Sequence, residues 1–339
     1  GVNEPTGWAD LADPRLRSWV GLVNPGQSGS ITTAFEAVLL RRGWTDGWRI
    51  LRRAAANSRS FSASSSKVPI EVSLGDAASG ICIDFYGRYQ AQAIADAGGG
   101  DRVGYMDPPG ETRIDADPIA MLRGAPDPEL ARRFVEFTLT AEGQSLWQLP
   151  PRSSAGAGDD DAGPERFALR RMPIRRDIYE SPLFARFVDQ VQPYAIASRV
   201  EVADRNVRSF IAPLFAAMAI DNHDALADAW TAIVTHPAYP PGDGIVTAAM
   251  VDDPELRAML EQFDAMPSVA GPDGAQLELE DTANLGTIRA GWLKSPQPEW
   301  ADQGLWPEQA SPADEMRRGF ARFFRARYRQ VVDLSRTAG

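Results

Sequence analysis

The stretch WVGLVNPGQSGSITTAFEAVLL at residues 19–40 contains, in order, a short apolar run, a loop rich in glycine and serine, and a longer apolar pattern. The run Trp19–Val23 predicts a buried strand, because it is short, apolar and followed by turn residues. Residues 31–40 predict a helix, since apolar side chains recur on one helical face: Ala34, Phe35, Val38 and Leu39. A strand, a tight loop and a helix in this order indicate an α/β fold.

The alternation of strands and helices continues on the C-terminal side of this stretch. The same criteria predict a helix from Trp44 to about residues 54–57, a strand at Ser60–Ser62, a helix at Ser66–Leu74 closed by Gly75, and strands at Gly80–Phe85 and Pro118–Leu122. Strands that alternate with helices favour a largely parallel sheet. We therefore expect an α/β lobe over residues 1–123.

Helical patterns dominate after residue 126. The tetrapeptides at Asp127–Leu130 and Asp253–Leu256 are both DPEL, which places aspartate at an N-cap and proline in the first turn of a helix. Apolar stripes at helical spacing follow, at residues 130–139, 207–218, 226–234, 256–263 and 316–331. We expect returning helices at residues 124–150, a mobile acidic linker at 151–176 that includes Ser153–Gly163, and a mostly helical C-terminal half at 177–339.

Length and charge exclude several classes of protein. A chain of 339 residues favours two folding units. The net charge of −11 disfavours a nucleic-acid binder, and no apolar run approaches the 18 residues of a transmembrane helix. Cys82 is the single cysteine, so neither a disulfide framework nor a cysteine-based zinc site is expected. No export signal is visible after Gly1, which leaves either a leader that has been removed or a fragment.

Two loops are candidates for ligand binding. Gln27, Ser28, Gly29 and Ser30 join the first predicted strand to its helix, and a helix start of this kind can hold an anion with its exposed N–H groups. An ordinary capped turn is the alternative. The residues Ser64, Ser65 and Ser66 precede the next short helix and offer several hydroxyls, although a plain serine-rich loop explains them as well.

A third candidate lies at Asp84 and Tyr86, where the predicted strand Gly80–Phe85 ends. Ligands of open α/β sheets gather at the carboxyl ends of strands. In a strand these two side chains point to one side and Phe85 to the other. Tyrosine can stack on a ligand, donate a hydrogen bond or, when ionised, bind ferric iron, whereas aspartate can bind a cation or an amine. We therefore favour a ligand-binding role for Asp84 and Tyr86 over a purely structural one.

The remaining polar patterns favour structural roles. His223 and His236 share no metal-binding spacing, and no nucleophile elbow is present. The arginines of the last helical pattern form a stripe that predicts a solvated face, with contact to anionic lipid or a partner as the alternative: Arg318, Arg322, Arg325 and Arg329.

Short motifs in a fixed order resemble the bacterial extracellular solute-binding proteins of ABC transporters, in the ferric-iron-binding branch of the type II periplasmic binding-protein fold. The matching pieces are Trp8–Arg15 (WADLADPR), Gly21–Gly29 (GLVNPGQSG), Ser64–Pro69 (SSSKVP), Gly75–Asp76, Ile83–Tyr86 (IDFY), Asp117–Leu122 (DPIAML), Ala131–Phe137 (ARRFVEF) and Glu142–Gln144 (EGQ). They cover residues 8–147.

The resemblance implies a two-lobed periplasmic or extracellular protein that closes on a small solute in an interlobe cleft and delivers it to a membrane permease. Association with the membrane is the alternative to a free protein. It implies no catalytic step and no cofactor. Iron binders of this kind hold the metal with two adjacent tyrosines, whose positions match Phe85 and Tyr86. Because phenylalanine cannot bind iron, only Tyr86 is left as a metal ligand, and an organic anion is favoured over ferric iron as the transported solute.

The resemblance also implies that an export signal and most of a first lobe belong before Trp8, so that residues 1–123 correspond to the second lobe. The helical half from residue 177 extends past the family's usual end, and docking, oligomerisation or completion of the lobe are its open roles.

Two other functions are the alternatives to transport. One is an enzyme on the same frame, for which no acid–base or nucleophile set is visible. The other is a non-transport module that docks on a membrane complex or regulator.

Overall fold

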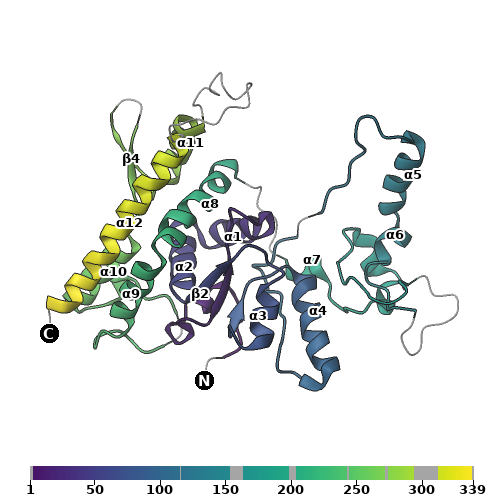
Figure 1. Cartoon of the computed structure of the whole chain (residues 1–339), viewed down its shortest axis with the longest axis horizontal. Helices are drawn as coiled ribbons and strands as arrows, with labels where there is room; N and C mark the ends of the chain where they lie inside the picture. The colour runs from purple at the N-terminus through teal and green to yellow at the C-terminus, as the bar shows by residue number, and fades with distance from the viewer. Residues whose placement is uncertain are drawn as a thin grey trace. The chain divides into compact units, whose positions relative to one another are not determined.

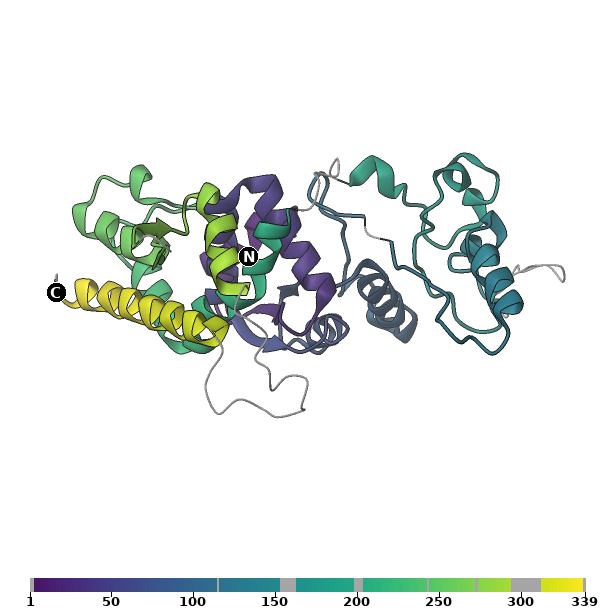
Figure 2. The same ribbon diagram turned by 90° about the horizontal axis from the view of Figure 1, so that it is seen from above.

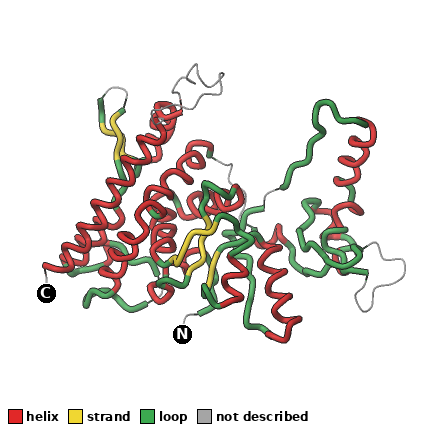
Figure 3. The backbone as a smooth tube through the Cα atoms, in the orientation of Figure 1, coloured by secondary structure: helices red, strands yellow, loops and turns green. Residues whose placement is uncertain are grey.

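The computed structural model of the chain describes residues 3–114, 116–152, 163–197, 204–242, 244–271, 274–293 and 312–337. These residues form two compact units (Figure 1). The first unit combines Gly1–Cys82 with Glu201–Gly339, and the second is Ile83–Val200. Helices make up most of the regular structure, and strands are few and short (Figure 3).

A small parallel sheet lies in the first unit, and it confirms the predicted α/β class. Its strands are β1 (Val20–Val23), β2 (Ser58–Ser62) and β3 (Ser79–Gly80), in the order β2-β1-β3. Both pairings are parallel. The helices α1 (Gly29–Arg42) and α2 (Trp44–Ala56) connect β1 to β2, and α3 (Val68–Leu74) connects β2 to β3. Gly75 ends α3 in the left-handed conformation at φ 79°, as its C-cap position requires.

The third strand is much shorter than predicted, and the segment after it is a helix. β3 ends at Gly80, whose close approach to the sheet leaves no room for a side chain, because a Cβ there would lie 2.6 Å from the Gly21 carbonyl oxygen. Asp84 begins α4 (Asp84–Ile94), where an acidic residue in the first turn suits the helix dipole. The prediction that Asp84 and Tyr86 end a strand is therefore wrong. A six-residue apolar run fits a strand or the entry to a helix equally well.

The predicted strand at Pro118–Leu122 is absent from the structure. These residues have no regular structure, and the side chains of Ile119, Met121 and Leu122 are exposed. Pro118 lacks the N–H that a sheet ladder needs, which disfavours pairing at this point.

Helices from the C-terminal part of the chain complete the first unit. They are α8 (Arg205–Met218), α9 (His223–Val234), α10 (Pro254–Asp264), α11 (Leu285–Leu293) and α12 (Pro312–Thr337), with the antiparallel strands β4 (Ser268–Ala270) and β5 (Gln276–Glu278). The apolar stripes that predicted α8, α9, α10 and α12 are buried except for the half-buried Val234, Met316 and Phe323, and Asp253 caps α10 as expected. The long helix α12 lies beside α8, α9 and α10 (Figures 1 and 2).

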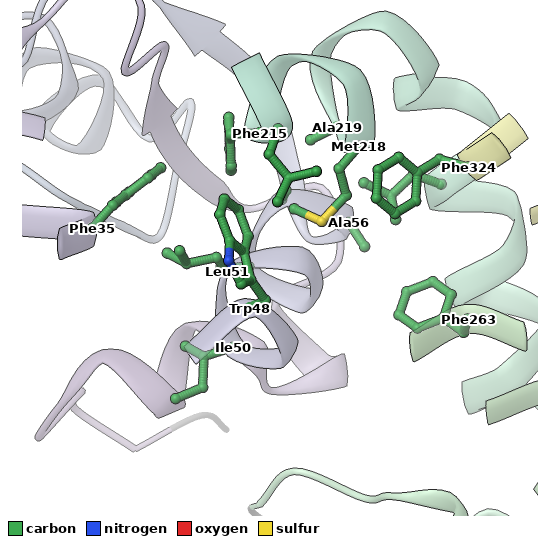
Figure 4. Close-up of a cluster of buried hydrophobic side chains, with 14 of the residues drawn as sticks. Phe35, Trp48, Ile50, Leu51, Ala56, Phe215, Met218, Ala219, Phe263 and Phe324 are labelled. Carbon is green, nitrogen blue, oxygen red and sulfur yellow. The ribbon is translucent and has the colours of Figure 1, made fainter. Parts of the chain in front are cut away.

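These late helices share one hydrophobic core with α1 and α2. Phe35 of α1 lies against Phe215 of α8 with ring centroids 5.0 Å apart, and the Trp44 indole N–H donates to the carbonyl oxygen of Leu279 at 2.7 Å. Figure 4 shows side chains of both parts in this core: Phe35, Trp48, Ile50, Leu51, Ala56, Phe215, Met218, Ala219, Phe263 and Phe324. Helices that the sequence suggested as a separate extension from residue 177 thus pack, from residue 204 onward, on the first 82 residues.

Two arginines of α2 are buried between the early and the late helices. Arg52 donates to the carbonyl oxygens of Phe263 and Ala265, and its guanidinium lies 5.2 Å from the ring centroid of Phe324. Burial lowers the pKa of Arg52. Arg53 forms an ion pair with Asp264 at 2.7 Å and donates to the Val246 carbonyl oxygen at 2.9 Å. The hydrogen-bond and ion-pair partners belong to α10 or to loops beside it, and Phe324 belongs to α12.

The second unit contains α4, the π-helical turn Ala95–Gly99, and the helices α5 (Pro128–Thr138), α6 (Ala141–Ser145) and α7 (Pro193–Ile196). Asp127 caps α5 by accepting from the Leu130 N–H at 2.9 Å, as predicted. No side chain of α5 is buried in the described part of the chain, and Phe134 is 59% exposed. A small hydrophobic cluster is formed by Ile178, Tyr179 and Phe187. The acidic stretch at 153–162, predicted to be mobile, lies outside the described residues.

No helix in the described ranges is long and apolar enough to span a membrane.

Candidate functional site

Two predicted binding loops begin side by side at the carboxyl edge of the parallel sheet. Val23 at the end of β1 pairs with Ser62 at the end of β2, and the Asn24 N–H donates to the Ser62 carbonyl oxygen at 2.9 Å. Parallel strands leave a sheet at the same edge, where α/β proteins bind ligands. The structure therefore brings the loop at residues 24–28 together with the loop at 63–67.

The first loop is held by hydrogen bonds from its own polar groups. The Asn24 side chain accepts from the Gly26 N–H at 2.8 Å, and the Asn24 carbonyl oxygen accepts from the Gln27 N–H at 3.0 Å. The Thr32 hydroxyl donates to the Pro25 carbonyl oxygen at 2.8 Å, which fixes the loop to the first turn of α1. These contacts determine where the N-terminus of α1 lies.

The N-terminus of α1 is open to solvent. Ser28 is its N-cap in an extended conformation, and its side chain makes no capping hydrogen bond. Gln27, Gly29 and Ser30 are exposed, and the space around Gly29 is open in the described structure. Because the first N–H groups of a helix have no partner within the helix, this turn offers donors and a positive dipole end to an anion.

The second loop contributes hydroxyls and a cation. The hydroxyl oxygens of Ser64 and Ser66 lie 2.9 Å apart, and both residues are half-buried, whereas Ser65 is buried. Lys67 follows them as the N-cap residue of α3 and is exposed. Lys67 is not among the residues predicted to bind a ligand, although its place directly after three serines, in a chain with two lysines, was the available signal.

A carboxylate is also present near this edge. The Ser62 hydroxyl donates to the Glu71 carboxylate on α3 at 2.7 Å. This hydrogen bond ties the end of β2 to α3 and engages one Glu71 oxygen with a protein donor. Ser62 therefore has a structural role, and the serines that follow it remain the candidates for ligand contact.

Asp84 and Tyr86 belong to the second unit, in the first turn of α4. Residues two apart on a helix do not face the same direction, so these side chains do not share a side as the strand prediction required. The Tyr86 ring packs on that of Phe85 with centroids 4.2 Å apart. The predicted site residues thus fall into two groups: Gln27–Ser30 with Ser64–Ser66 in the first unit, and Asp84 with Tyr86 in the second.

Asp84 lies in an environment that disfavours its charge. Burial raises the pKa of Asp84, the Arg88 guanidinium and the Phe85 N–H act in the opposite direction, and the nearby Asp107 carboxylate raises it further. The net result is a pKa above the usual value of 3.8. The folded protein therefore binds this proton more tightly than the unfolded chain does.

Asp84→Asn should stabilise the second unit at neutral pH. A raised folded pKa means that stability decreases as the pH rises through the usual value of an aspartate and then through the raised one. Asparagine removes this dependence, so the variant should exceed the natural chain in stability at pH 7 and approach it near pH 3.5. Hydrogen exchange of the α4 amides at the two pH values measures the difference. Asp177→Asn is the control, because a hydrogen bond from Arg175 lowers the pKa of Asp177, and its loss should not stabilise.

Metal binding by the usual ligands finds no support in the described structure. Within those residues, no group of three or more histidine, cysteine, aspartate or glutamate side chains could hold a metal ion. Tyr86, the single tyrosine expected to bind ferric iron, packs on a phenylalanine.

Comparison with known proteins adds one finding. A search of curated proteins and a search of solved structures give no match. Residues 2–148 match the model of a protein family described as bacterial extracellular solute-binding protein. The match is less than half of the chain, and it includes both loops of the sheet edge as well as α4, α5 and α6. Over these residues the chain is similar to bacterial proteins that bind solutes outside the cell.

Proposed function

We propose that the chain is the substrate-binding component of an ABC-type uptake system and that it binds a small anionic solute at the carboxyl edge of its parallel sheet. The observation that carries the proposal is the adjacency of the two loops, at residues 24–30 and 63–67, in a segment similar to extracellular solute-binding proteins. The solute is bound and released unchanged, and a membrane permease is the partner that receives it.

The groups at this edge suit an anion. The N-terminus of α1 supplies N–H donors from Gly29 and Ser30, with a dipole contribution of about 0.3–1 kcal/mol. The hydroxyls of Ser64 and Ser66 supply donors that rotate to meet an oxygen, and Lys67 supplies a compensating charge. Organic phosphates, phosphonates and sulfonates carry the several oxygens that such a donor set can engage.

Ferric iron is the less favoured solute. It requires hard anionic ligands, and the position beside Tyr86 is occupied by Phe85. The support for an anion comes from groups of the first unit, whereas the iron hypothesis depends on Tyr86 in the second. Absorbance in the visible range after incubation with ferric citrate tests it directly, because a tyrosinate–iron bond is coloured.

Ser28→Asp tests the anion site. Aspartate is as good an N-cap as serine, so helix α1 should be preserved, while the new negative charge lies where the anion is expected. Thermal shift with phosphate, glycerol 3-phosphate, methylphosphonate and ethanesulfonate identifies a binding anion, and calorimetry then measures its Kd. We expect Ser28→Asp to weaken that binding about tenfold or more, since 1.4 kcal/mol of repulsion suffices for this change.

Thr140→Asp is the matched control, because it adds the same charge at another N-cap, that of α6. It should leave the affinity unchanged. The proposal fails if none of the four anions binds saturably, or if the two aspartate variants weaken binding equally.

A further inference from the structure

The second unit contains an open cavity of its own, whose wall includes Arg88 and Asp107, two neighbours of Asp84. Its volume is about 680 Å³, which lies within the usual range of about 300–1,000 Å³ for small-molecule sites. All of its lining residues belong to residues 88–196, so the second unit alone forms it. Four charged side chains of the wall are nearly buried: Arg88, Asp107, Arg170 and Asp189.

The four charged side chains come from separate segments and are arranged as two ion pairs. Arg88 on α4 pairs with Asp107, whose other carboxylate oxygen accepts from the Tyr105 hydroxyl at 2.9 Å. Arg170 pairs with Asp189 through two of its nitrogens and donates with the third to the Arg88 carbonyl oxygen at 2.7 Å. All the guanidinium nitrogens of Arg170 are therefore engaged with protein acceptors.

Arg88, in contrast, has hydrogen-bonding capacity that the protein does not use. Its side chain is 7% exposed, and its Nε is enclosed by protein atoms, so a ligand in the cavity does not reach that nitrogen. Its Nη1 lies 3.8 Å from the Asp189 carboxylate, which is beyond hydrogen-bond distance. Nη1 is therefore the nitrogen of Arg88 that can donate to an acceptor oxygen supplied by a ligand.

The charges of the wall limit the kind of ligand. Among the nearly buried side chains, two arginines and two aspartates balance one another, so a ligand with a net charge would leave one of these charges without compensation. The fifth charged residue of the lining, Asp101, is exposed to solvent. A ligand that carries both signs keeps the balance: its carboxylate meets Arg88, and its ammonium meets Asp189 or Asp107. The rest of the lining includes the apolar side chains of Ala91, Val103, Met106, Val191 and Ile196.

We propose that this cavity is a second ligand site, which binds a small zwitterion with an apolar body, of the class of α-amino acids with hydrocarbon side chains. The site is separate from the sheet edge of the first unit and does not depend on the function proposed for it. The ion pairs position Arg88, and the apolar wall contacts the hydrocarbon part.

Calorimetry on the full chain with L-leucine tests the proposal, and two analogues test the charge argument. 4-Methylpentanoate lacks the ammonium of leucine, and 3-methylbutylamine lacks its carboxylate. Leucine should bind saturably, and each analogue should bind at least about tenfold more weakly, since each leaves one charge of the wall uncompensated. This comparison uses the unaltered chain, so it does not depend on how a variant folds.

A variant that fills the cavity locates the binding. Ala91→Phe places a ring in the cavity from half-buried α4 without touching the ion pairs, and it should weaken leucine binding about tenfold or more. Ala93→Phe is the control, because Ala93 is also half-buried on α4 but does not line the cavity. Absence of saturable leucine binding, equal affinity for either analogue, or equal effects of the two phenylalanine variants would each overturn the proposal.

Discussion

A chain that ends at residue 148 should not fold into a stable unit, although it contains the whole segment similar to solute-binding proteins. The reason is that the core beside α1 and α2 is completed by later helices. Buried aromatic side chains of that core come from after residue 204: Phe210, Phe215, Trp230, Phe263 and Phe324. Burial of each contributes about 1.5–3 kcal/mol, so their joint loss is comparable with the entire stability of a typical domain, about 5–15 kcal/mol.

Circular dichroism during heating and amide dispersion in NMR spectra measure the outcome. We expect the truncated chain to show a broad, non-cooperative thermal transition and poorly dispersed amide signals. The control joins residues 1–82 to residues 204–339 by a flexible glycine–serine linker, which keeps the first unit and removes the second. That chain should melt cooperatively. A cooperative transition in the truncated chain would show that the late helices are dispensable for the α/β part.

Local patterns predicted most elements of the first unit and the start of α5 in the second. β1, α1 and α2 follow from short-range periodicity, and the caps at Asp127 and Asp253 follow from side chains that bond to N–H groups three residues away. Each of these signals lies within about a dozen residues, so the predicted element does not depend on how the rest of the chain folds.

Errors arose where a short apolar run had no local signal to decide its structure. The run Gly80–Phe85 fits a strand by composition, yet the chain leaves the sheet at Gly80 and Asp84 starts a helix. Periodicity also does not encode which amphipathic elements meet. The joint core of α2 with α8, α10 and α12, and with it the burial of Arg52 and Arg53, depends on contacts more than 150 residues apart in sequence.

For the candidate site, the sequence located loops better than it located individual groups. The Gln27–Ser30 and Ser64–Ser66 loops were each predicted from their own residues, and the sheet register shows that they are neighbours. The sequence did not predict that Ser65 is buried, that Ser62 bonds to Glu71, or that Lys67 lies exposed at the start of α3. Those details depend on side-chain packing. Ligand binding by the predicted residues remains a prediction.

Arg53→Met should destabilise the first unit by about 3–5 kcal/mol, the usual effect of removing one partner of a buried ion pair. The Arg53 side chain is 1% exposed, and its two terminal nitrogens donate to both Asp264 carboxylate oxygens, at 2.7 and 3.1 Å. Methionine can occupy much of the same space but leaves the Asp264 charge without its main partner. It also leaves the Val246 carbonyl oxygen without the hydrogen bond that Arg53 donates. Urea unfolding followed by tryptophan fluorescence gives the difference in free energy.

Two further variants separate the ion pair from general damage to the core. Arg59→Met removes an ion pair with Asp76 in which both side chains are more than half exposed, and it should change stability by about 1 kcal/mol or less. Arg53→Met combined with Asp264→Leu removes both charges, so it should be more stable than Arg53→Met alone, because no buried carboxylate is left without its partner. If the double variant is as unstable as the single one, the uncompensated charge is not the cause, and the hydrogen bond to Val246 and the packing of Arg53 on Trp230 account for the loss.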